Sequence, residues 1–409
     1  MKQYDTIIIG GGAVGLSTAY FMKEAGLDVL VIERDKTGNG CSYGNAGYIV
    51  PSHFVPLASP GMIGQGIKWM FSPQSPFSIT PKADAGMIRW LMKFARYCTR
   101  AHVESTSQII YDLNIQSKEL YKTMSRRLGF SLTDNGLLML YLSEHEAAGE
   151  KDMVAKAVGL GIDASILNND QLRMMEPAIG PKVIGGAYYK SDAHLNPAEM
   201  MQALKTYLSD NIVYGSVKDF TVTGKKITTV KTSDNSYSAK NFVVSAGYYS
   251  KEILKKLNYN LLLESGKGYS FKTPMHTAMK IPALLMEARV AVTPMNGQIQ
   301  FAGTMQIGKG LKNHTRGKIR GLVNSVGDYL PAYEMNNKKP EGIWAGLRPL
   351  SPDGLPYIGK SARFDNLYIG AGHAMMGISL APVTGQILTG LLMGEKQDWD
   401  MKLLSPDRF

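Results

Sequence analysis

Residues 4–34 read YDTIIIGGGAVGLSTAYFMKEAGLDVLVIER, and this stretch decides the fold. The short apolar run Tyr4–Ile9 predicts a buried parallel strand. Three glycines with the spacing G-x-G-x-x-G follow it: Gly10, Gly12 and Gly15. The helix predicted after them ends at Gly26, which suits a helix C-terminus, and Leu27–Ile32 predicts a second strand. The stretch therefore predicts a βαβ unit.

This βαβ unit has the features of a dinucleotide-binding site. Gly10 permits the tight turn, Gly12 lets a pyrophosphate approach the backbone, and Gly15 allows close packing of the helix. The helix N-terminus offers free N–H groups and a partial positive charge to phosphate. Glu33, at the end of the second strand, can accept hydrogen bonds from ribose hydroxyls. A structural βαβ unit without a ligand is the alternative, and the motif alone does not distinguish NAD from FAD.

The segments that follow favour FAD. A nicotinamide dehydrogenase would continue with repeated βα units, whereas here a loop rich in Gly, Ser and Pro covers residues 37–66. Within it, CSYGNAGYIVPS (41–52) carries the small side chains required where backbone packs flat against a large ring. An ordinary surface loop is the alternative interpretation of this composition.

A second glycine-rich turn occurs near the end of the chain. Gly370, Gly372 and Gly377 precede a predicted helix over Ile378–Met393, and Pro382 is tolerable only in its first turn. We therefore expect the helix to start near Gly377, with a buried stripe comprising Leu380, Val383, Ile387 and Leu391. Its N-terminus could stabilise the negative charge that a flavin ring gains on reduction.

Arg348 is the candidate substrate-binding residue. It lies in GLRPLSPDGLPYIG (346–359), which predicts a Pro/Gly-rich loop just before the last strand. A guanidinium can bind a carboxylate through two parallel hydrogen bonds, which fixes orientation as well as charge. A surface arginine, or a structural ion pair with Asp353, is the alternative.

Composition narrows the function classes. Lys plus Arg (45) exceeds Asp plus Glu (34), giving a net charge of +11, which suits anionic substrates, nucleic acid or an acidic membrane, or simply a solvated basic surface. The only cysteines, Cys41 and Cys98, exclude a disulfide scaffold and favour a reducing, cytoplasmic location. The seven histidines show no metal-binding spacing, so no metal is expected. No apolar run reaches transmembrane length.

The rest of the chain predicts a mixed α/β fold. Helical periodicity covers residues 83–124. Further strands are expected at Gly136–Leu142, Gly185–Tyr189, Ile212–Phe220, Lys226–Thr232, Phe242–Ala246 and Met286–Phe301, and further helices at Pro197–Leu208 and Lys309–Leu330. The strands over residues 212–246 are typical of an antiparallel meander beside the nucleotide site.

Several motifs together resemble the D-amino-acid oxidase (DAO) family of flavoproteins. They are the N-terminal fingerprint, SYGNAG (42–47), VVSAGYYS (243–250), GLRPLSPDGLPYIG (346–359), GHAMMGISLAP (372–382) and the terminal SPDRF (405–409). SPFSITPKAD followed by RWLMKF (75–94) extends the resemblance across nearly the whole chain. Within this family the sequence is most similar to the bacterial D-amino-acid dehydrogenase small-subunit branch.

The resemblance implies a Rossmann-like FAD-binding domain interleaved with an antiparallel-sheet substrate domain. We expect residues 1–80, 193–252 and 341–409 in the first domain, and residues 81–192 and 253–340 in the second. Because no cysteine follows Cys98, FAD is expected to be noncovalent.

The resemblance also implies roles for particular residues. The FAD-binding set comprises Gly10, Gly12, Ala13, Val14, Gly15, Glu33, Arg34, Ser42, Asn45, Ala46, Gly47, Val217, Gly372, Gly377, Ile378 and Ser379. Arg348 occupies the carboxylate-binding position, and Tyr269 is a candidate second carboxylate or lid contact, with a core tyrosine as the alternative. His53 matches no family residue and is interpreted as a polar loop histidine.

The activity implied is oxidation of an amino or imino acid, with a D-amino acid expected. The Cα hydrogen leaves as hydride to the flavin, and the imine hydrolyses to a keto acid and ammonia. Oxidation of glycine, sarcosine or a 2-hydroxy acid is the alternative, and a tRNA-modifying flavin domain is a remote one, since the sequence shows no RNA-binding module. A quinone or partner electron carrier is the expected acceptor, and the stretch Lys68–Phe71 suggests peripheral contact with the inner face of a membrane.

Overall fold

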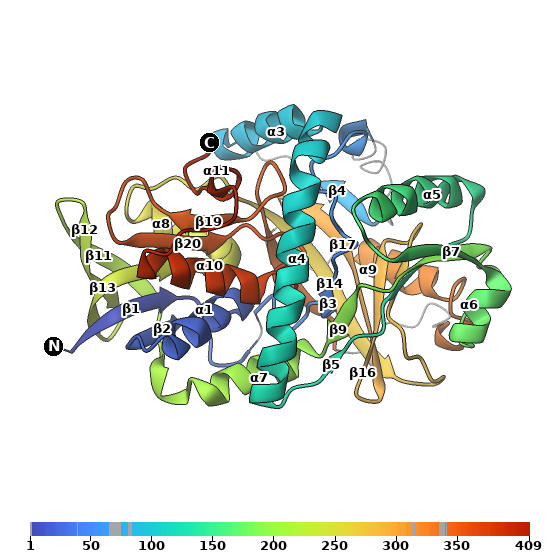
Figure 1. Cartoon of the computed structure of the whole chain (residues 1–409), viewed down its shortest axis with the longest axis horizontal. Helices are drawn as coiled ribbons and strands as arrows, with labels where there is room; N and C mark the ends of the chain where they lie inside the picture. Colours follow the sequence, from blue (N-terminus) through green and yellow to red (C-terminus); the bar gives the residue numbers. More distant parts are fainter. Residues whose placement is uncertain are drawn as a thin grey trace.

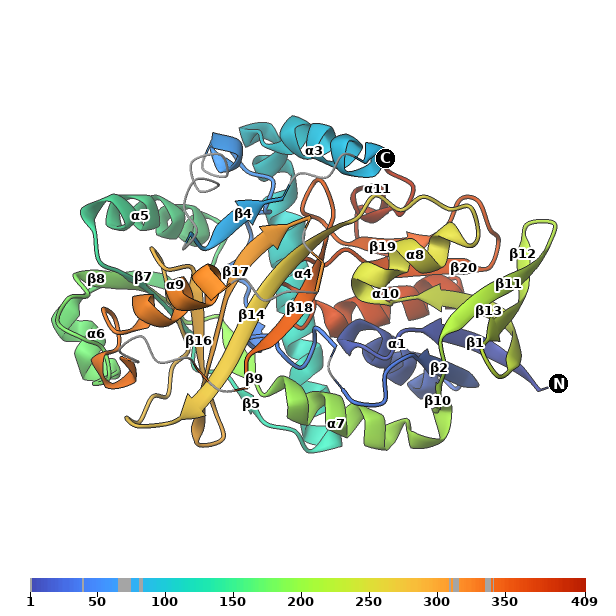
Figure 2. The same cartoon turned by 180° about the vertical axis from the view of Figure 1, so that it is seen from behind.

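A computed structural model describes residues 2–38, 40–64, 75–80, 84–308, 310–311, 316–334, 340 and 342–409. The segment Lys68–Phe71 lies outside these residues. Two large sheets lie next to each other, and the long helix α4 (Arg100–Leu128) runs across the molecule at their boundary (Figure 1). The chain passes between the two sheets several times, as Figure 2 shows from the opposite side.

The first sheet contains the predicted βαβ unit. Its strands are β1 (Gln3–Ile9), β2 (Val29–Glu33), β10 (Ile212–Tyr214), β11 (Val217–Thr223), β12 (Lys226–Thr232), β13 (Ser236–Val244), β19 (Tyr357–Lys360) and β20 (Leu367–Ala371). Strands β10, β2, β1, β13 and β20 are parallel, and β11, β12 and β13 form the predicted antiparallel meander. The single strand predicted over Ile212–Phe220 is wrong: the chain turns at Gly215, whose N–H donates to Glu33 O, so β10 and β11 take different places in the sheet.

Helices α1 (Ala13–Glu24) and α10 (Ala381–Met393) pack against each other beside this sheet (Figure 2). A Cβ at Gly385 would lie 2.8 Å from the carbonyl carbon of Ser17, so the helices approach closely. The predicted start of the second helix near Gly377 is wrong, because residues 378–380 form turns and Pro382 still occupies the first helical turn. Leu391, predicted to be buried, is only partly covered.

The second sheet is largely antiparallel. Its strands are β4 (Phe77–Ile79), β6 (Leu137–Tyr141), β7 (Ala164–Asn168), β8 (Gly185–Tyr189), β14 (Glu264–Pro274), β15 (Ala283–Leu285), β16 (Val290–Met295), β17 (Gln298–Ile307) and β18 (Trp344–Leu350). β18 pairs with β14 at the edge nearest the first sheet (Figure 2). The loop predicted around Arg348 is therefore wrong, since this residue lies within β18.

A small third sheet joins β3 (Tyr48–Ile49), β9 (Ala193–Leu195) and β5 (Leu132–Thr133). Further helices among the described residues are α3 (Ala85–Tyr97), α5 (Glu144–Gly159), α6 (Asn169–Met175), α7 (Pro197–Tyr207), α8 (Ser250–Lys255), α9 (Arg316–Val326) and α11 (Met401–Leu404). Because β4 and β18 belong to the second sheet, we propose moving them to the substrate-binding domain and keeping the other predicted boundaries.

Candidate active site

A cavity of about 1040 Å³ is lined by residues from both large sheets. Fourteen of the predicted site residues line it: Gly10, Gly12, Ala13, Val14, Glu33, Arg34, Ser42, Asn45, Ala46, Val217, Arg348, Gly377, Ile378 and Ser379. Four others do not, namely Gly15, Gly47, Gly372 and Tyr269. Segments more than 300 residues apart in the sequence therefore share one cavity.

At one end of the cavity the backbone of the β1–α1 turn forms the wall. Gly10 has φ +112° and approaches the next strand closely, since a Cβ there would lie 2.6 Å from Ser245 O. Gly15 is required for packing, because its Cβ would lie 1.9 Å from Gly10 O. The Glu33 carboxylate accepts a hydrogen bond from Gly11 N (2.5 Å) at the end of β2. This arrangement provides a glycine turn, a helix N-terminus and an acidic residue around one space.

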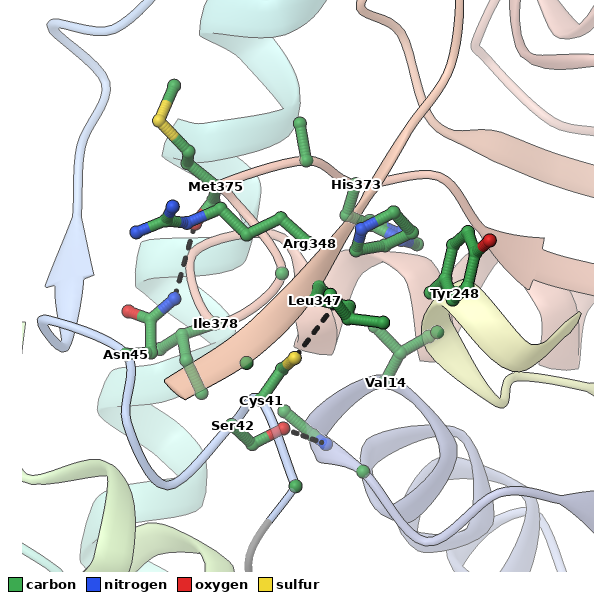
Figure 3. Close-up of a pocket in the computed structure, with 18 of the residues that line it drawn as sticks. Val14, Cys41, Ser42, Asn45, Tyr248, Leu347, Arg348, His373, Met375 and Ile378 are labelled. Atoms are coloured by element: carbon green, nitrogen blue, oxygen red, sulfur yellow. Dashed lines mark hydrogen bonds between the residues drawn. The ribbon is translucent and has the colours of Figure 1, made fainter. Parts of the chain in front are cut away.

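The N-terminal loop and the C-terminal turn are tied together around the middle of the cavity (Figure 3). The Ser42 hydroxyl accepts from Ala13 N (2.9 Å), and Asn45 Nδ2 donates to Met375 O (3.2 Å). Val50 N donates to the Ser379 hydroxyl (3.0 Å). The last two bonds join the loop directly to the C-terminal turn, and the first joins the loop to the start of α1.

Helix α4 fixes the turn at residues 378–379 from behind. Tyr121 donates its hydroxyl proton to Ile378 O (2.7 Å), and Ser117 donates to Ser379 O (2.5 Å). The Ser379 hydroxyl in turn donates to Asn114 Oδ1 (2.5 Å). All five side chains are buried, so the turn is held rigidly against the cavity.

The two remaining predicted glycines have conformational roles. Gly47 has φ +78°, and a Cβ there would lie 2.1 Å from Leu195 O. Gly372 has φ +79° and packs against the Tyr357 ring. Both allow turns that bring their neighbours to the cavity.

Arg348 extends from β18 into the cavity (Figure 3). Its Nη1 donates to Thr304 O (2.6 Å), and the facing strand leaves room only because residue 268 is glycine: a Cβ there would lie 2.1 Å from this nitrogen. The predicted alternative, an ion pair with Asp353, is wrong, because Asp353 pairs with Arg408 (2.7 Å). No carboxylate in the described part of the chain forms an ion pair with Arg348. Burial lowers the pKa of Arg348, which nevertheless stays charged near neutral pH.

Thr304 lies beside this arginine in a strained conformation. Its φ is +66°, which is a genuine outlier for a β-branched residue. The residue is 8% exposed and lines the cavity, and its hydroxyl has no hydrogen-bond partner among the described residues. Arg289 (φ 52°) and Ala374 (φ 49°) also line the cavity, so backbone strain concentrates here.

Tyr269 lies elsewhere, contrary to the prediction. It is 1% exposed, donates to Gln306 Oε1 (3.0 Å) and packs in the core of the second sheet. Successive residues of a strand point to opposite faces, and on β14 it is Gly268 that faces Arg348. The alternative interpretation, a core tyrosine, therefore describes this residue.

Cys41, His373 and His53 are among the cavity residues that the sequence did not predict for the site. The Cys41 thiol donates to Leu347 O (2.9 Å) at the cavity wall (Figure 3). His373 contacts the Thr384 hydroxyl (2.9 Å), and burial lowers its pKa to about 3. His53 also lines the cavity, and burial lowers its pKa to about 4. The only available signal was a polar residue within an otherwise apolar or glycine-rich loop.

Comparison with known protein families matches residues 5–391 to the family described as FAD dependent oxidoreductase (DAO). The chain belongs to this family. The DAO fold and the FAD cofactor predicted from the sequence are therefore confirmed. Similar curated proteins include the D-amino acid dehydrogenases of Bradyrhizobium diazoefficiens (28% identical, 98% of each chain) and Helicobacter pylori (28% identical, 96% of this chain and 95% of the relative).

Solved structures of other DAO-fold enzymes superpose over the whole chain. Glycine oxidase from Geobacillus kaustophilus has a TM-score of 0.80 at 19% identity, with both chains fully covered. L-proline dehydrogenase from P. horikoshii has a TM-score of 0.75 at 20% identity, covering 100% of this chain and 98% of that one. At these identities the likeness supports the fold alone.

The cavity of this DAO-family member fits FAD on its own geometry. The β1–α1 turn has only glycine where a phosphate would meet backbone, and the buried Ser245 hydroxyl lining the cavity has no partner among the described residues. Arg34 lies over the Tyr249 ring (4.0 Å from its centroid), so both residues help to form the wall beyond Glu33. Among described residues there is no His/Cys/Asp/Glu group that could hold a metal. Nor does any described helix have the length and apolarity needed to cross a membrane.

Proposed function

We propose that this protein catalyses the FAD-dependent oxidation of an amino or imino acid, with a D-amino acid as its substrate. The observation that carries this proposal is the Arg348 guanidinium, which lies inside the FAD-sized cavity without a carboxylate partner in the described part of the chain. Leaving a partly buried cation unpaired costs free energy, and a substrate carboxylate offsets that cost.

The assigned roles follow from the positions of the residues. Gly10, Gly12, Glu33 and the turn at residues 377–379 hold FAD, which accepts a hydride when bound. Arg348 binds the substrate carboxylate through parallel hydrogen bonds and so orients Cα. The Thr304 hydroxyl donates a further hydrogen bond to the same carboxylate. The imine product hydrolyses to a keto acid and ammonia, or stays cyclic if the substrate is proline-like.

The choice of a D-amino acid rests on the names of the relatives that span almost the whole chain at 28% identity. Oxidation of glycine, as in the structural neighbours titled glycine oxidase, fits the cavity equally well but is not favoured by any residue here.

The decisive test is anaerobic reduction of the bound flavin by a panel of D- and L-amino acids, glycine, sarcosine, hydroxyprolines and 2-hydroxy acids. We expect bleaching of the flavin absorbance by one or more D-amino or imino acids. Bleaching by 2-hydroxy acids alone, or by no compound while dithionite still bleaches the flavin, would refute the proposal.

We further propose that a membrane quinone or a protein electron carrier reoxidises the enzyme. Helix α3 supports contact with an anionic membrane, because Ile88 (52% exposed) and Met92 (63% exposed) lie on its solvent face beside exposed Arg89 and Arg96. Cosedimentation with anionic vesicles should fall when Ile88 and Met92 are both replaced by Ser. Equal sedimentation of this variant and the wild type would contradict the assignment of α3.

A further inference from the structure

Three side chains form a hydrogen-bonded chain that leads from the cavity to a buried carboxylate. His53 lines the cavity, and its Nδ1 lies 3.1 Å from the Ser52 hydroxyl. This hydroxyl donates to Asp192 Oδ2 (2.5 Å), while Ser52 N donates to Asp192 Oδ1 (3.0 Å). Asp192 is fully buried. Since Asp192 accepts the Ser52 proton, His53 donates from Nδ1, which leaves its Nε2 as an acceptor.

The backbone positions this chain next to the proposed reaction site. Ser52 follows β3 and Asp192 precedes β9, and these two strands pair antiparallel. At one end of the loop, Val50 N donates to the Ser379 hydroxyl in the turn proposed to hold the flavin. At the other end, Leu57 N lies 2.9 Å from a Cβ placed on Gly354, in the loop that follows β18. The segment that carries His53 therefore runs from the flavin turn to the loop that follows β18, and His53 lines the cavity.

The surroundings of Asp192 are unusual for a buried carboxylate. Its hydrogen bonds among the described residues come from Ser52, not from a cation. Lys118 of α4, a cation whose charge acts on Asp192, instead contacts Asp134 (2.5 Å) and Ser191 O (2.7 Å). Burial raises the pKa of Asp192 to about 7; the bonds from Ser52 and the charge of Lys118 lower it, and the charge of Asp134 raises it.

Two tyrosines also interact with this carboxylate. Tyr48 on β3 and Tyr189 on β8 both interact electrostatically with Asp192. Burial raises the pKa of each tyrosine far above neutrality, so both stay protonated. Asp192 is therefore the group in this cluster that titrates near neutral pH.

We propose that His53, Ser52 and Asp192 form a proton relay that deprotonates the substrate ammonium group. The proposal rests on the proposed function, since only an amine substrate supplies this proton. The N–H bond of the ammonium breaks, and its proton joins His53 Nε2. The Nδ1 proton then passes to Ser52, and the Ser52 proton passes to Asp192, which becomes neutral. The nitrogen keeps the electron pair that the later loss of hydride from Cα requires.

A purely structural role for Asp192 predicts different behaviour, and Asp192→Asn separates the two. The amide can still accept from Ser52 N and bond to the Ser52 hydroxyl, so the loop keeps its hydrogen bonds but loses the proton acceptor. In the wild type, Asp192 is protonated below a pH of about 7, so kcat/KM should fall as pH decreases through that value. His53 does not itself titrate in this pH range, because burial lowers its pKa to about 4 and the ring is neutral near pH 7.

The experiment measures kcat/KM against pH for the FAD-loaded wild type, Asp192→Asn and His53→Gln with one amino acid identified by the flavin-bleaching panel. Near pH 7 both variants should lose about 100-fold in kcat/KM, and the loss should shrink at high pH, where the free amine binds directly. Asp134→Asn is the matched control, because this carboxylate also lies near Lys118 but outside the relay. It should keep the wild-type kcat/KM at high pH, and the fall of kcat/KM should move to lower pH, because the charge of Asp134 raises the pKa of Asp192.

Thermal unfolding provides a readout that is independent of activity. The pKa of Asp192 is raised in the folded state, so its stabilising contribution is complete below the unfolded value of 3.8 and is lost as pH rises through about 7. The Tm of Asp192→Asn minus the Tm of the wild type should therefore be larger at pH 9 than at pH 6.

Two outcomes would overturn the relay. One is an unchanged pH profile in both Asp192→Asn and His53→Gln, and the other is an equal loss of kcat/KM at every pH. If Asp192→Asn does not fold, His53→Gln decides, because His53 is only partly buried at the cavity wall. A wild type whose flavin is reduced by no amino acid would instead refute the proposed function.

Discussion

The two ends of the cavity are built in opposite ways. The FAD end uses mainly backbone: glycines Gly10, Gly12 and Gly15 and one acidic side chain, Glu33, all within a single βαβ unit. The substrate end uses side chains from four separate segments: His53 from the loop after β3, Arg289 and Thr304 from the strands of the second sheet and their connections, and Arg348 from β18.

This difference has a physical origin. A pyrophosphate presents the same charges in every member of such a family, so a short backbone turn is sufficient to bind it. A small substrate must be bound at its carboxylate, amine and side chain at once, and a single chain segment cannot supply contacts to all three. Changes at the FAD end should therefore alter cofactor content, and changes at the substrate end should alter kinetics with cofactor retained.

The largest expected effect tests the FAD end. Gly15→Ala places a Cβ 1.9 Å from Gly10 O, a backbone atom that cannot move away, and should destabilise the protein by about 3 kcal/mol and abolish FAD binding. Gly12→Ala is the matched control, because its Cβ would meet only the Ser42 hydroxyl, at 3.5 Å. It should leave the stability of the FAD-free protein unchanged yet weaken FAD about 10- to 100-fold. Thermal unfolding and flavin titration measure both quantities.

The proposed backbone binding of FAD would be contradicted if Gly12→Ala bound FAD as tightly as the wild type. In that case the turn would not approach the pyrophosphate, and the glycine at this position would have no role in ligand binding.

The next largest effect tests the substrate end. Arg348→Ala should lower kcat/KM by about 100- to 1,000-fold, because a charged bidentate interaction is lost, while the flavin stays bound. Arg348→Lys keeps the charge but loses the fork that bonds to Thr304 O and to a carboxylate together, so an intermediate loss is expected. Steady-state kinetics measure the loss of kcat/KM, and the flavin-to-protein ratio shows whether FAD stays bound. Normal kinetics in Arg348→Ala would end the carboxylate assignment.

The smallest effect sharpens the role of Thr304. Thr304→Val keeps the shape but removes the unpartnered hydroxyl, and should raise KM about 10-fold with little change in FAD affinity. Thr304→Ser keeps the hydroxyl and should stay close to the wild type. If the two variants have the same KM, the hydroxyl makes no contact with substrate, and the strained backbone serves only to point Thr304 O at Arg348.

The sequence predicted the local elements well where a pattern repeats within one segment. The strands β8 and β12 have the predicted bounds, and α7 ends within one residue of its prediction. The sequence-based prediction was wrong where the local structure depends on pairing with a segment far away in the chain. Arg348 lies between Gly346 and Pro349, a composition typical of a loop, but pairing of this segment with β14 makes it a strand. Tyr269 was misassigned because the sequence does not show which face of β14 meets the cavity.

The histidine relay was hidden for the same reason. His53 and Ser52 are adjacent in the chain, but Asp192 is 140 residues away from Ser52 and meets it only through the pairing of β3 with β9. Nothing in the local composition of either segment indicates that a carboxylate is buried against that serine.

The sequence by itself determined the βαβ unit, the DAO family and the cofactor. Phosphate binding depends on the spacing of glycines, which can be recognised within a single segment of about thirty residues. Only the tertiary structure decided that Arg348 has no carboxylate partner among the described residues, that Thr304 is strained beside it, and that His53 connects to a buried carboxylate. Such features depend on strand pairing, side-chain direction and burial, and these arise from contacts between segments that are far apart in the chain.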